Sequence, residues 1–295
     1  MQRVEEQIKR LIDEINYEEV SRLFATLSGG KRLRAKLILK IAKDHEDAPL
    51  LAAIVELIHA ASLLHDDVID EAMTRRGKAS VNATDGSKTA VMLGDILYSK
   101  AFTELVVFDK LVAQTIAASV TALSKGEMMD VKMAESFNSD EHLYLDMLYL
   151  KTATLIEAAA KASALLAGKN AASHALYGKN LGLSFQIIDD ILDITSDAAT
   201  LGKPAMNDFV EGKCTLPYIY LYHAMDEQDK HRLVSLHTKE LSSEDAEWIK
   251  ANMKHYQTIE KSFALAQKLS NEAQEAMKDD EELVAILETM IKRSY

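Results

Sequence analysis

Helix-breaking residues are rare along the whole of this chain of 295 residues. It contains three prolines, Pro49, Pro204 and Pro217, and eleven glycines, and so few interruptions favour long continuous helices. The stretches between them are apolar or amphipathic at helical spacing. The sequence therefore predicts an all-α fold. Because it contains no linker or low-complexity segment, it also predicts a single domain over residues 1–295.

The overall charge and the cysteine count narrow the class of protein. The net charge of −12 argues against nucleic acid as a partner, because a nucleic-acid-binding surface is basic. The single cysteine, Cys214, excludes an intramolecular disulfide and fits a reducing compartment. The N-terminus is a charged amphipathic stretch, and no run of about 18 apolar residues predicts a membrane span. We therefore expect a cytoplasmic protein with no transmembrane segment.

Three aspartates, Asp66, Asp67 and Asp70, end an apolar helical run that extends from Leu50 to Leu64. Residues four apart project from one face of a helix, so Asp66 and Asp70 lie together, with Asp67 close by. Like charges this close would take up protons when buried unless a cation sat among them. Carboxylate oxygens suit a hard ion such as Mg²⁺, which usually binds a few carboxylates together with substrate phosphates. Bases that could hold those phosphates follow at once: Arg75, Arg76 and Lys78.

A second copy of this pattern lies in the C-terminal half of the chain. Asp189, Asp190 and Asp193 repeat the spacing inside another apolar helical run, and Lys203 and Lys213 follow. A single acidic run is usually a solvated helix face. Two copies of D-D-x-x-D, each among large apolar residues and each followed by bases, indicate paired cation sites.

A third cationic group follows a glycine pair near the N-terminus. Lys31 and Arg34 lie in the first turn of the helix predicted after Gly29-Gly30. Cations at this end of a helix oppose the macrodipole and cost stability unless an anion binds there. We therefore interpret Lys31 and Arg34 as diphosphate ligands.

In this order and at these spacings, the motifs resemble those of the trans-prenyltransferases, the head-to-tail polyprenyl diphosphate synthases, over nearly the whole chain. Within this family the chain resembles medium- and long-chain members such as octaprenyl or hexa- and heptaprenyl diphosphate synthases. The resemblance rests on these segments: Gly29-Gly30-Lys31-Arg32-Leu33-Arg34, Glu56-Leu57-Ile58-His59, Asp66-Asp67-x-x-Asp70, Arg75-Arg76-Gly77, Lys151-Thr152, Phe185-Gln186, Asp189-Asp190-x-x-Asp193 and Gly202-Lys203-Pro204 with Asp208 and Lys213. It implies the isoprenoid synthase fold, a single-domain bundle of long antiparallel helices around a central cavity, usually as a homodimer.

The resemblance also implies a reaction. Isopentenyl diphosphate would condense head-to-tail with an allylic diphosphate, farnesyl or geranyl diphosphate, by Mg²⁺-dependent ionisation, condensation and elimination. About three Mg²⁺ would bind one allylic diphosphate between the facing motifs. The implied metal ligands are Asp66, Asp67, Asp70, Asp189, Asp190 and Asp193.

The family's substrate contacts map onto matching positions of this chain. The isopentenyl diphosphate ligands would be Lys31, Arg34, His59 and Arg76. The allylic diphosphate would contact Arg75, Lys151, Thr152, Gln186, Lys203 and Lys213. The residues expected to act in catalysis are Asp66, Asp70, Arg75, Lys151, Asp189 and Lys203. Without the resemblance, His59 would be an ordinary core histidine and Lys151 a lysine reaching towards solvent.

Two positions depart from the family's usual pattern, and one segment carries no readable role. Ala35 stands where proline is frequent, which should affect only the start of a helix. Met206 stands where glycine is common, which leaves the backbone path of the loop after Lys203 open. The basic pair Lys292 and Arg293 is either solvated or closes over the active site.

Product length should depend on residues just before the first motif. Ala61 and Ser62 lie one turn before Asp66 and are both small, so a growing tail could pass them. One helical turn is about 5.4 Å, close to the length of one isoprene unit. We therefore expect an all-trans C30–C40 product for a quinone side chain, with transient membrane contact when it is released. The alternative is a short-chain C15–C20 synthase.

Three other classes are less consistent with the motifs. A class I terpene cyclase would not need the second diphosphate site at Lys31 and Arg34. A di-iron helical bundle would show Glu-x-x-His pairs, which are missing. A non-catalytic subunit of a heteromeric synthase would be expected to lack aspartates in one motif, although an active subunit could still depend on a partner.

Overall fold

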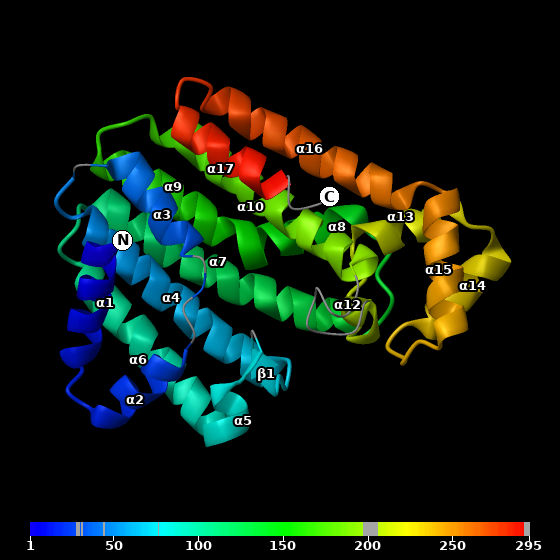
Figure 1. Cartoon of the computed structure of the whole chain (residues 1–295), viewed down its shortest axis with the longest axis horizontal. Coiled ribbons are helices and arrows are strands. Elements are labelled where there is room, and N and C mark those ends of the chain that lie inside the picture. The colour runs from blue at the N-terminus through cyan, green and yellow to red at the C-terminus, as the bar shows by residue number, and fades with distance from the viewer. Residues whose placement is uncertain (28–29, 31, 44, 76, 197–205, 292–295) are drawn as a thin grey trace. The chain divides into compact units, whose positions relative to one another are not determined.

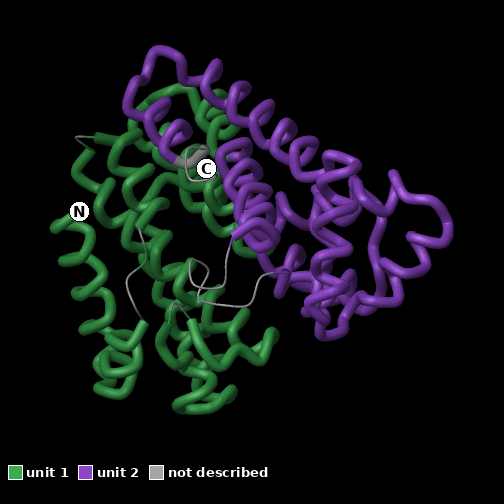
Figure 2. Tube along the Cα trace, turned by 45° about the vertical axis from the view of Figure 1, so that its right-hand side comes forward, with its two compact units in different colours: residues 1–121, 155–178 green, residues 122–154, 179–295 purple. Residues whose placement is uncertain are grey.

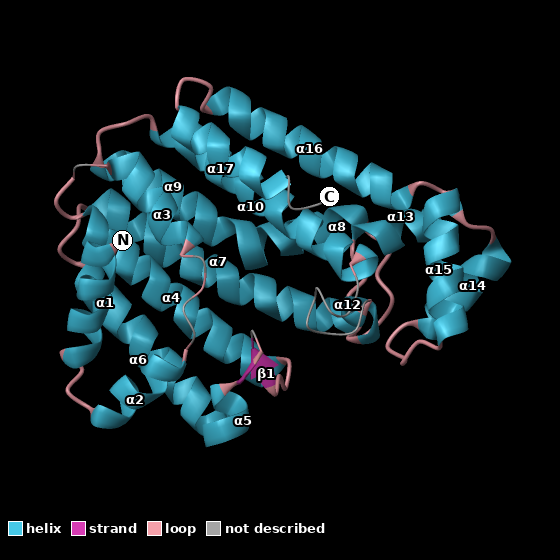
Figure 3. Cartoon of the chain, viewed as in Figure 1, coloured by secondary structure: helices cyan, strands magenta, loops and turns pink. Residues whose placement is uncertain are grey.

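The computed structural model describes residues 1–27, 30, 32–43, 45–75, 77–196 and 206–291. Helices dominate this part of the chain (Figures 1 and 3), which confirms the all-α prediction. The chain divides into two compact units, residues 1–121 with 155–178 and residues 122–154 with 179–295 (Figure 2). The single domain stays a prediction. Five residues singled out in the sequence lie outside the described residues: Lys31, Arg76, Lys203, Lys292 and Arg293.

The first unit contains most of the N-terminal helices. Its elements are α1 (Gln2–Asp13), α2 (Glu18–Thr26), α3 (Leu33–Ala42), α4 (Ala48–Ile69), β1 (Thr74–Arg75), β2 (Lys78–Ala79), α5 (Val81–Asp85), α6 (Ser87–Leu105) and nearly all of α9 (Thr154–Leu166). Two helices, α7 (Lys110–Ala134) and α10 (Ala171–Thr195), begin in the first unit and end in the second.

Helix α4 is the core of the first unit. It packs against α1, α3 and α6, and its residues from Leu51 to Ile58 are all buried. An apolar helix enclosed on several sides has no polar face, which agrees with the apolar run between Leu50 and Leu64 in the sequence. Pro49 is the second residue of the helix, where proline is well tolerated. Burial therefore fixes the helix that carries the first aspartate motif.

A buried carboxylate links α4 to the start of α3. Glu56 is 5% exposed; its Oε1 accepts a hydrogen bond from the Ala35 amide at 3.0 Å, and its Oε2 accepts one from Arg32 Nη1 at 3.1 Å. The first amides of a helix have no partner within the helix. A proline at position 35 has no N–H and could not make this bond. The departure from the family pattern at Ala35 thus creates a cap for α3.

The second unit contains the remaining elements. These are α8 (Glu141–Leu148), the π-helix η1 (Tyr149–Ala153), α12 (Asn207–Val210), α13 (Leu216–Ala224), α14 (Glu227–Leu236), α15 (Ser243–His255), α16 (Thr258–Ala276) and α17 (Glu281–Ile291). One core cluster joins buried residues of α8, α10 and α13, and another centres on Phe209, Tyr218 and Leu233. The first of these clusters surrounds the helix that carries the second aspartate motif.

Helix α4 is also, in the described part of the chain, the one helix long and apolar enough to cross a membrane. The sequence analysis found no such run, because Glu56 and two histidines interrupt the apolar residues. The mean hydropathy over an 18-residue window of the helix is nevertheless 1.6. Of that window, 67% is buried inside the structure. The packing of α4 is that of a core helix.

Glu56→Ala should destabilise the chain, because it leaves the Ala35 amide and the Arg32 guanidinium without their buried acceptor. We expect a loss of about 1–3 kcal/mol in the free energy of unfolding, measured by urea denaturation. Glu56→Gln, which keeps one acceptor oxygen, should lose less. Equal stability of Glu56→Ala and the unmodified chain would show that the cap contributes nothing.

Candidate active site

The first aspartate motif lies at the C-terminal end of α4, and Asp70 is the residue that ends the helix. Asp67 is 4% exposed, whereas Asp66 is half-buried and Asp70 exposed. Carboxylates at a helix C-terminus oppose the macrodipole, which favours cations there. The negative charge of the motif is therefore unfavourable at this end of the helix, and a bound cation would compensate for it.

Asp67 is held by the adjacent hairpin. Its Oδ1 accepts a hydrogen bond from Arg75 Nε at 2.6 Å, and its backbone oxygen accepts from the Ala72 amide at 2.9 Å and from Asn82 Nδ2 at 3.2 Å. Burial raises the pKa of the Asp67 carboxyl, and the charge of Arg75 opposes that shift. Asp67 thus ties the hairpin to the end of α4.

The hairpin brings two predicted bases into register. Strands β1 and β2 pair antiparallel, with Arg75 opposite Lys78. Gly77 in the turn has φ +73°, a left-handed conformation that glycine adopts at little cost. The hairpin therefore brings Arg75 and Lys78 side by side just beyond the acidic end of α4.

The face of α4 next to the motif packs closely on α6. His65 Nε2 lies 3.2 Å from the Val91 carbonyl oxygen and 3.4 Å from Asp95 Oδ1. A Cβ added to Gly94 would lie 2.3 Å from the same nitrogen, so only glycine permits this approach. Gly94 thus marks a point where α4 and α6 pack closely. This packing also gives His65, to which the sequence assigned no role, a place between the helices.

The aspartates of the second motif, on α10, differ in their exposure to solvent. Asp189 is exposed, whereas Asp190 is 4% and Asp193 is 3% exposed. The Tyr144 hydroxyl donates to Asp190 Oδ2, and Gln186 Nε2 donates to Asp190 Oδ1 at 3.0 Å. Burial, followed by the charge of Asp208, raises the pKa of Asp190 to about 7.

Asp193 anchors the segment that follows the motif. Its backbone oxygen accepts from the Met206 amide at 2.7 Å, and its Oδ2 accepts from the Asp208 amide at 3.2 Å. Met206 has φ +63° and a side chain that is 1% exposed. Glycine is common at this position in the family because such a φ suits glycine. Here the buried methionine side chain offsets the backbone cost by packing in the core.

Lys151 lies in η1 and faces two carboxylates. Its Nζ lies 2.9 Å from Glu127 Oε2 and 2.5 Å from Asp130 Oδ2. Burial by itself would lower the pKa of the lysine, but these two charges outweigh it and raise the pKa. A Cβ on Gly126 would lie 2.4 Å from the Lys151 amide nitrogen, so glycine allows α7 to approach η1. Single π-turns such as η1 are frequent at functional sites.

Several of these residues line one cavity within the second unit. Its volume is about 160 Å³, enough for a few ordered waters or a small polar group. The lining side chains that the sequence or the geometry singles out are Asp130, Tyr144, Lys151, Thr152, Gln186, Asp190, Asp208 and Lys213. Thr152 Oγ1 donates to Gln186 Oε1 at 3.2 Å, and Lys213 Nζ lies 2.9 Å from Glu211 Oε2.

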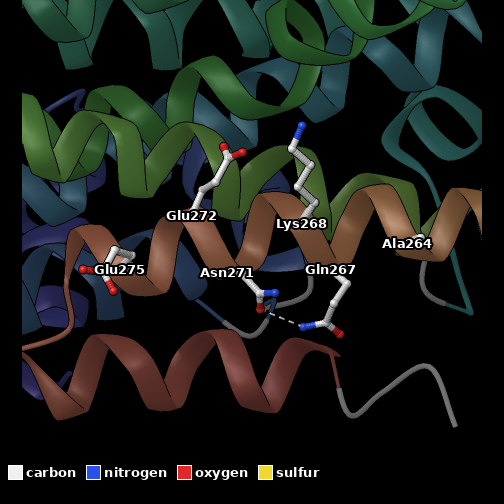
Figure 4. Close-up of a pocket in the computed structure, with 6 residues that line it drawn as sticks. All are labelled: Ala264, Gln267, Lys268, Asn271, Glu272 and Glu275. Atoms are coloured by element: carbon white, nitrogen blue, oxygen red, sulfur yellow. Dashed lines mark hydrogen bonds between the residues drawn. The ribbon is translucent and has the colours of Figure 1, made fainter.

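A larger open groove of about 500 Å³ runs along α16 (Figure 4). Three of its polar side chains have hydrogen-bond partners: Gln267 donates to Asn271 at 3.0 Å, and Asn180 of α10 donates to Glu272 at 3.1 Å. No residue of either aspartate motif lines it. The smaller cavity is therefore the better candidate for the active site, despite its size.

The donor set suits magnesium. In the part of the chain that is described, no three His, Cys, Asp or Glu side chains converge on one point. Mg²⁺ does not need such a set, since it binds one or two carboxylates and completes its octahedron with waters and phosphate oxygens. The oxygen donors of Asp66, Asp70 and Asp189 fit this mode of binding.

The structure brings some predicted residues together and adds others. Within the second unit, Lys151, Thr152, Gln186, Asp190 and Lys213 share the cavity. Within the first unit, Arg75 contacts the first motif; Arg34 and His59 are half-buried on α3 and α4.

The sequence analysis missed the roles of Tyr144, Glu127 and Asp130. The local sequence contains no signal for Asp130, because Lys125, Glu127 and Lys132 surround it with other charges.

Comparison with known proteins shows which family the chain belongs to. The model of the family described as "Polyprenyl synthetase" matches residues 17–256. The short chain isoprenyl diphosphate synthase of Methanothermobacter thermautotrophicus is 38% identical over 247 residues, which cover 79% of this chain and 76% of that protein. The octaprenyl diphosphate synthase of Escherichia coli is 37% identical over 228 residues, 74% of this chain and 69% of that protein. The crystal structure of octaprenyl pyrophosphate synthase from Helicobacter pylori is 44% identical with a TM-score of 0.92, covering 99% of this chain and 97% of that chain.

An all-α isoprenoid synthase fold with two aspartate motifs defines a prenyltransferase of the polyprenyl diphosphate synthase class. The chain belongs to the polyprenyl synthetase family.

The raised pKa of Asp190 predicts a pH dependence of stability in metal-free protein. Between the usual aspartate pKa and about 7, the folded chain binds one proton more than the unfolded chain at this carboxyl. Stability should therefore fall as the pH rises from the usual aspartate pKa to about 7 and level off above 7, by a total on the order of a few kcal/mol. Denaturation in EDTA at pH 5–8 measures it.

Asp190→Asn should remove this part of the pH dependence, whereas Asp146→Asn on the exposed side of α8 should keep it. An unchanged pH profile in Asp190→Asn would contradict the assignment of the proton to this carboxyl.

Proposed function

We propose that this chain condenses isopentenyl diphosphate head-to-tail with an allylic diphosphate, farnesyl or geranyl diphosphate, and releases an all-trans C30–C40 polyprenyl diphosphate for a quinone side chain. The observation that carries the proposal is the pairing of each D-D-x-x-D motif with a base. Arg75 contacts the first motif, and Lys151 and Lys213 share a cavity with the second. Membership in the family supplies the reaction class.

The resemblance divides the expected ligands between the two substrates. Lys31, Arg34, His59 and Arg76 would hold isopentenyl diphosphate. Arg75, Lys151, Thr152, Gln186, Lys203 and Lys213 would hold the allylic diphosphate, together with both aspartate motifs. When bound, about three Mg²⁺ would neutralise the leaving diphosphate as its bond to carbon breaks.

The side chains of this chain have three tasks in that reaction. The bases stabilise negative charge on the leaving group, and their charges are most effective where water is excluded. In the absence of substrate, Asp130 and Glu127 hold Lys151 in place, which orients its ammonium before the diphosphate binds. The apolar surroundings keep water from the allylic cation. The released diphosphate is the plausible acceptor of the proton, since the motifs offer no obvious general base.

Two small residues support a long product. Ala61 is fully buried and Ser62 half-buried on α4, one turn before Asp66. Ser62 Oγ donates to the His59 carbonyl oxygen at 2.9 Å, so neither side chain occupies space beyond its own helix. A C15–C20 product is the second candidate, because one relative is named a short chain synthase.

We further propose a homodimer in the cytoplasm, with transient membrane contact during product release. Support for the homodimer comes from exposed apolar residues after α6 and at the start of α7: Val106 is 78%, Val107 65% and Leu111 63% exposed. Contiguous exposed apolar surface is typical of an association site.

Incubation of the purified chain with Mg²⁺, farnesyl diphosphate and labelled isopentenyl diphosphate tests the proposed activity. We expect products that lengthen to C30–C40 and no turnover when EDTA is present. Asp189→Ala should lower kcat by a factor of about 100 or more, as expected for loss of a metal ligand. The Asp146→Ala control should be unaffected. Cyclised hydrocarbons, or turnover in EDTA, would contradict the proposal.

Ser62→Phe should shorten the product, because an aromatic ring would block the path of the tail along α4. We expect products of C20 or less, resolved by thin-layer or liquid chromatography. Ala60→Phe, which projects from a different side of the helix, is the matched control and should keep the original length. Ala61→Phe tests the same point, with thermal unfolding as a check because that position is fully buried. An unchanged product in both Ser62→Phe and Ala61→Phe would reject the proposed path.

A further inference from the structure

Tyr144 makes an unusual contact for a buried tyrosine. Its side chain belongs to the apolar core of the second unit and is 2% exposed, yet its hydroxyl donates a hydrogen bond to Asp190 in the second aspartate motif. A tyrosine ring fixed by packing has little freedom to turn. The position of the hydroxyl is therefore set by the core around it.

Asp190 is occupied on both of its oxygens. Oδ2 accepts from Tyr144, and Oδ1 accepts from Gln186 Nε2 at 3.0 Å. The side chain is 4% exposed, whereas Asp189 beside it is exposed. Mg²⁺ retains several waters and demands a near-ideal octahedron. Protein donors therefore use one lone pair on each oxygen of Asp190, which makes this carboxylate a poorer ligand for that shell than the exposed Asp189.

The same bonds fix the orientation of Gln186. Its amide has one donor end and one acceptor end. Because Asp190 needs the NH₂ group, the amide oxygen is left for the Thr152 hydroxyl, which donates to it at 3.2 Å. A continuous chain of hydrogen bonds thus runs from Tyr144 through Asp190 and Gln186 to Thr152, and all four residues line the cavity.

We infer that Tyr144 is a positioning residue, which holds Asp190 inward as a hydrogen-bond anchor, so that Asp190 orients Gln186 and Thr152 and does not ligate metal. The inference rests on the proposed function and departs from the sequence analysis, which counted Asp190 among the metal ligands. Tyr144 does not need to touch substrate. It acts through two residues that do.

Tyr144→Phe removes one hydroxyl and keeps the ring. Tyr218→Phe is a matched control: Tyr218 is also fully buried in the second unit, stacks on Phe209 at 4.4 Å and has no hydrogen-bond partner for its hydroxyl among the described residues. The two variants therefore make the same chemical change, with and without loss of a bond to a carboxylate.

We expect Tyr144→Phe to lower kcat roughly tenfold, the usual effect of losing one hydrogen bond to a charged group. Calorimetric titration with inorganic pyrophosphate and Mg²⁺ should show affinity several-fold weaker than in Tyr218→Phe, without any turnover. The KM for isopentenyl diphosphate should change less than twofold, because its expected ligands lie on the first unit. A general loss of folded protein would not produce this separation.

The outcomes separate the two proposals. If the unmodified chain neither elongates farnesyl diphosphate nor binds pyrophosphate with Mg²⁺, the proposed function fails and this inference falls with it. If the unmodified chain is active and Tyr144→Phe matches Tyr218→Phe in kcat and in pyrophosphate affinity, this inference alone is overturned. If Tyr144→Phe does not fold, Gln186→Met removes the other donor to Asp190. Unchanged pyrophosphate affinity in that variant would overturn the inference equally.

Discussion

The rest of this structure depends on one constraint: carboxylates buried within apolar helices need partners that compensate their charge. Burying an unpaired charge is costly, and a buried ion needs hydrogen bonds or an opposite charge close by. Each unit meets this requirement with short contacts. In the first unit Arg75 meets Asp67 and Arg32 meets Glu56. In the second, Lys151 lies between Glu127 and Asp130.

The two aspartate motifs meet the constraint in the same way. In each, the second aspartate is buried and accepts hydrogen bonds from neighbouring side chains, Asp67 from Arg75 and Asp190 from Tyr144 and Gln186. The first aspartate of each motif is more exposed. Neighbouring residues on a helix point about 100° apart, so adjacent aspartates cannot both face the same surface. The D-D pair therefore combines an outward carboxylate with an inward one, and the inward one fixes the helix end in place.

Both units also have a glycine that lets a neighbouring element pack closely beside the polar residues. Gly94 admits His65 beside the first motif, and Gly126 admits η1 beside Lys151. In both cases a single Cβ would overlap with the neighbouring element. Polar groups near each motif are thus held by packing as well as by hydrogen bonds, which limits the reorganisation needed when a charged substrate binds.

The sequence by itself determined the helical class, the burial of α4, both aspartate motifs and the bases near them. These follow from periodicity and from charge placed against apolar surroundings, which are local properties of the chain. It did not reveal that Tyr144 bonds Asp190, that Glu127 and Asp130 hold Lys151, or that the Ala35 amide is capped by Glu56. Each of those contacts joins residues from different elements, and only tertiary packing decides which polar groups meet inside an apolar core.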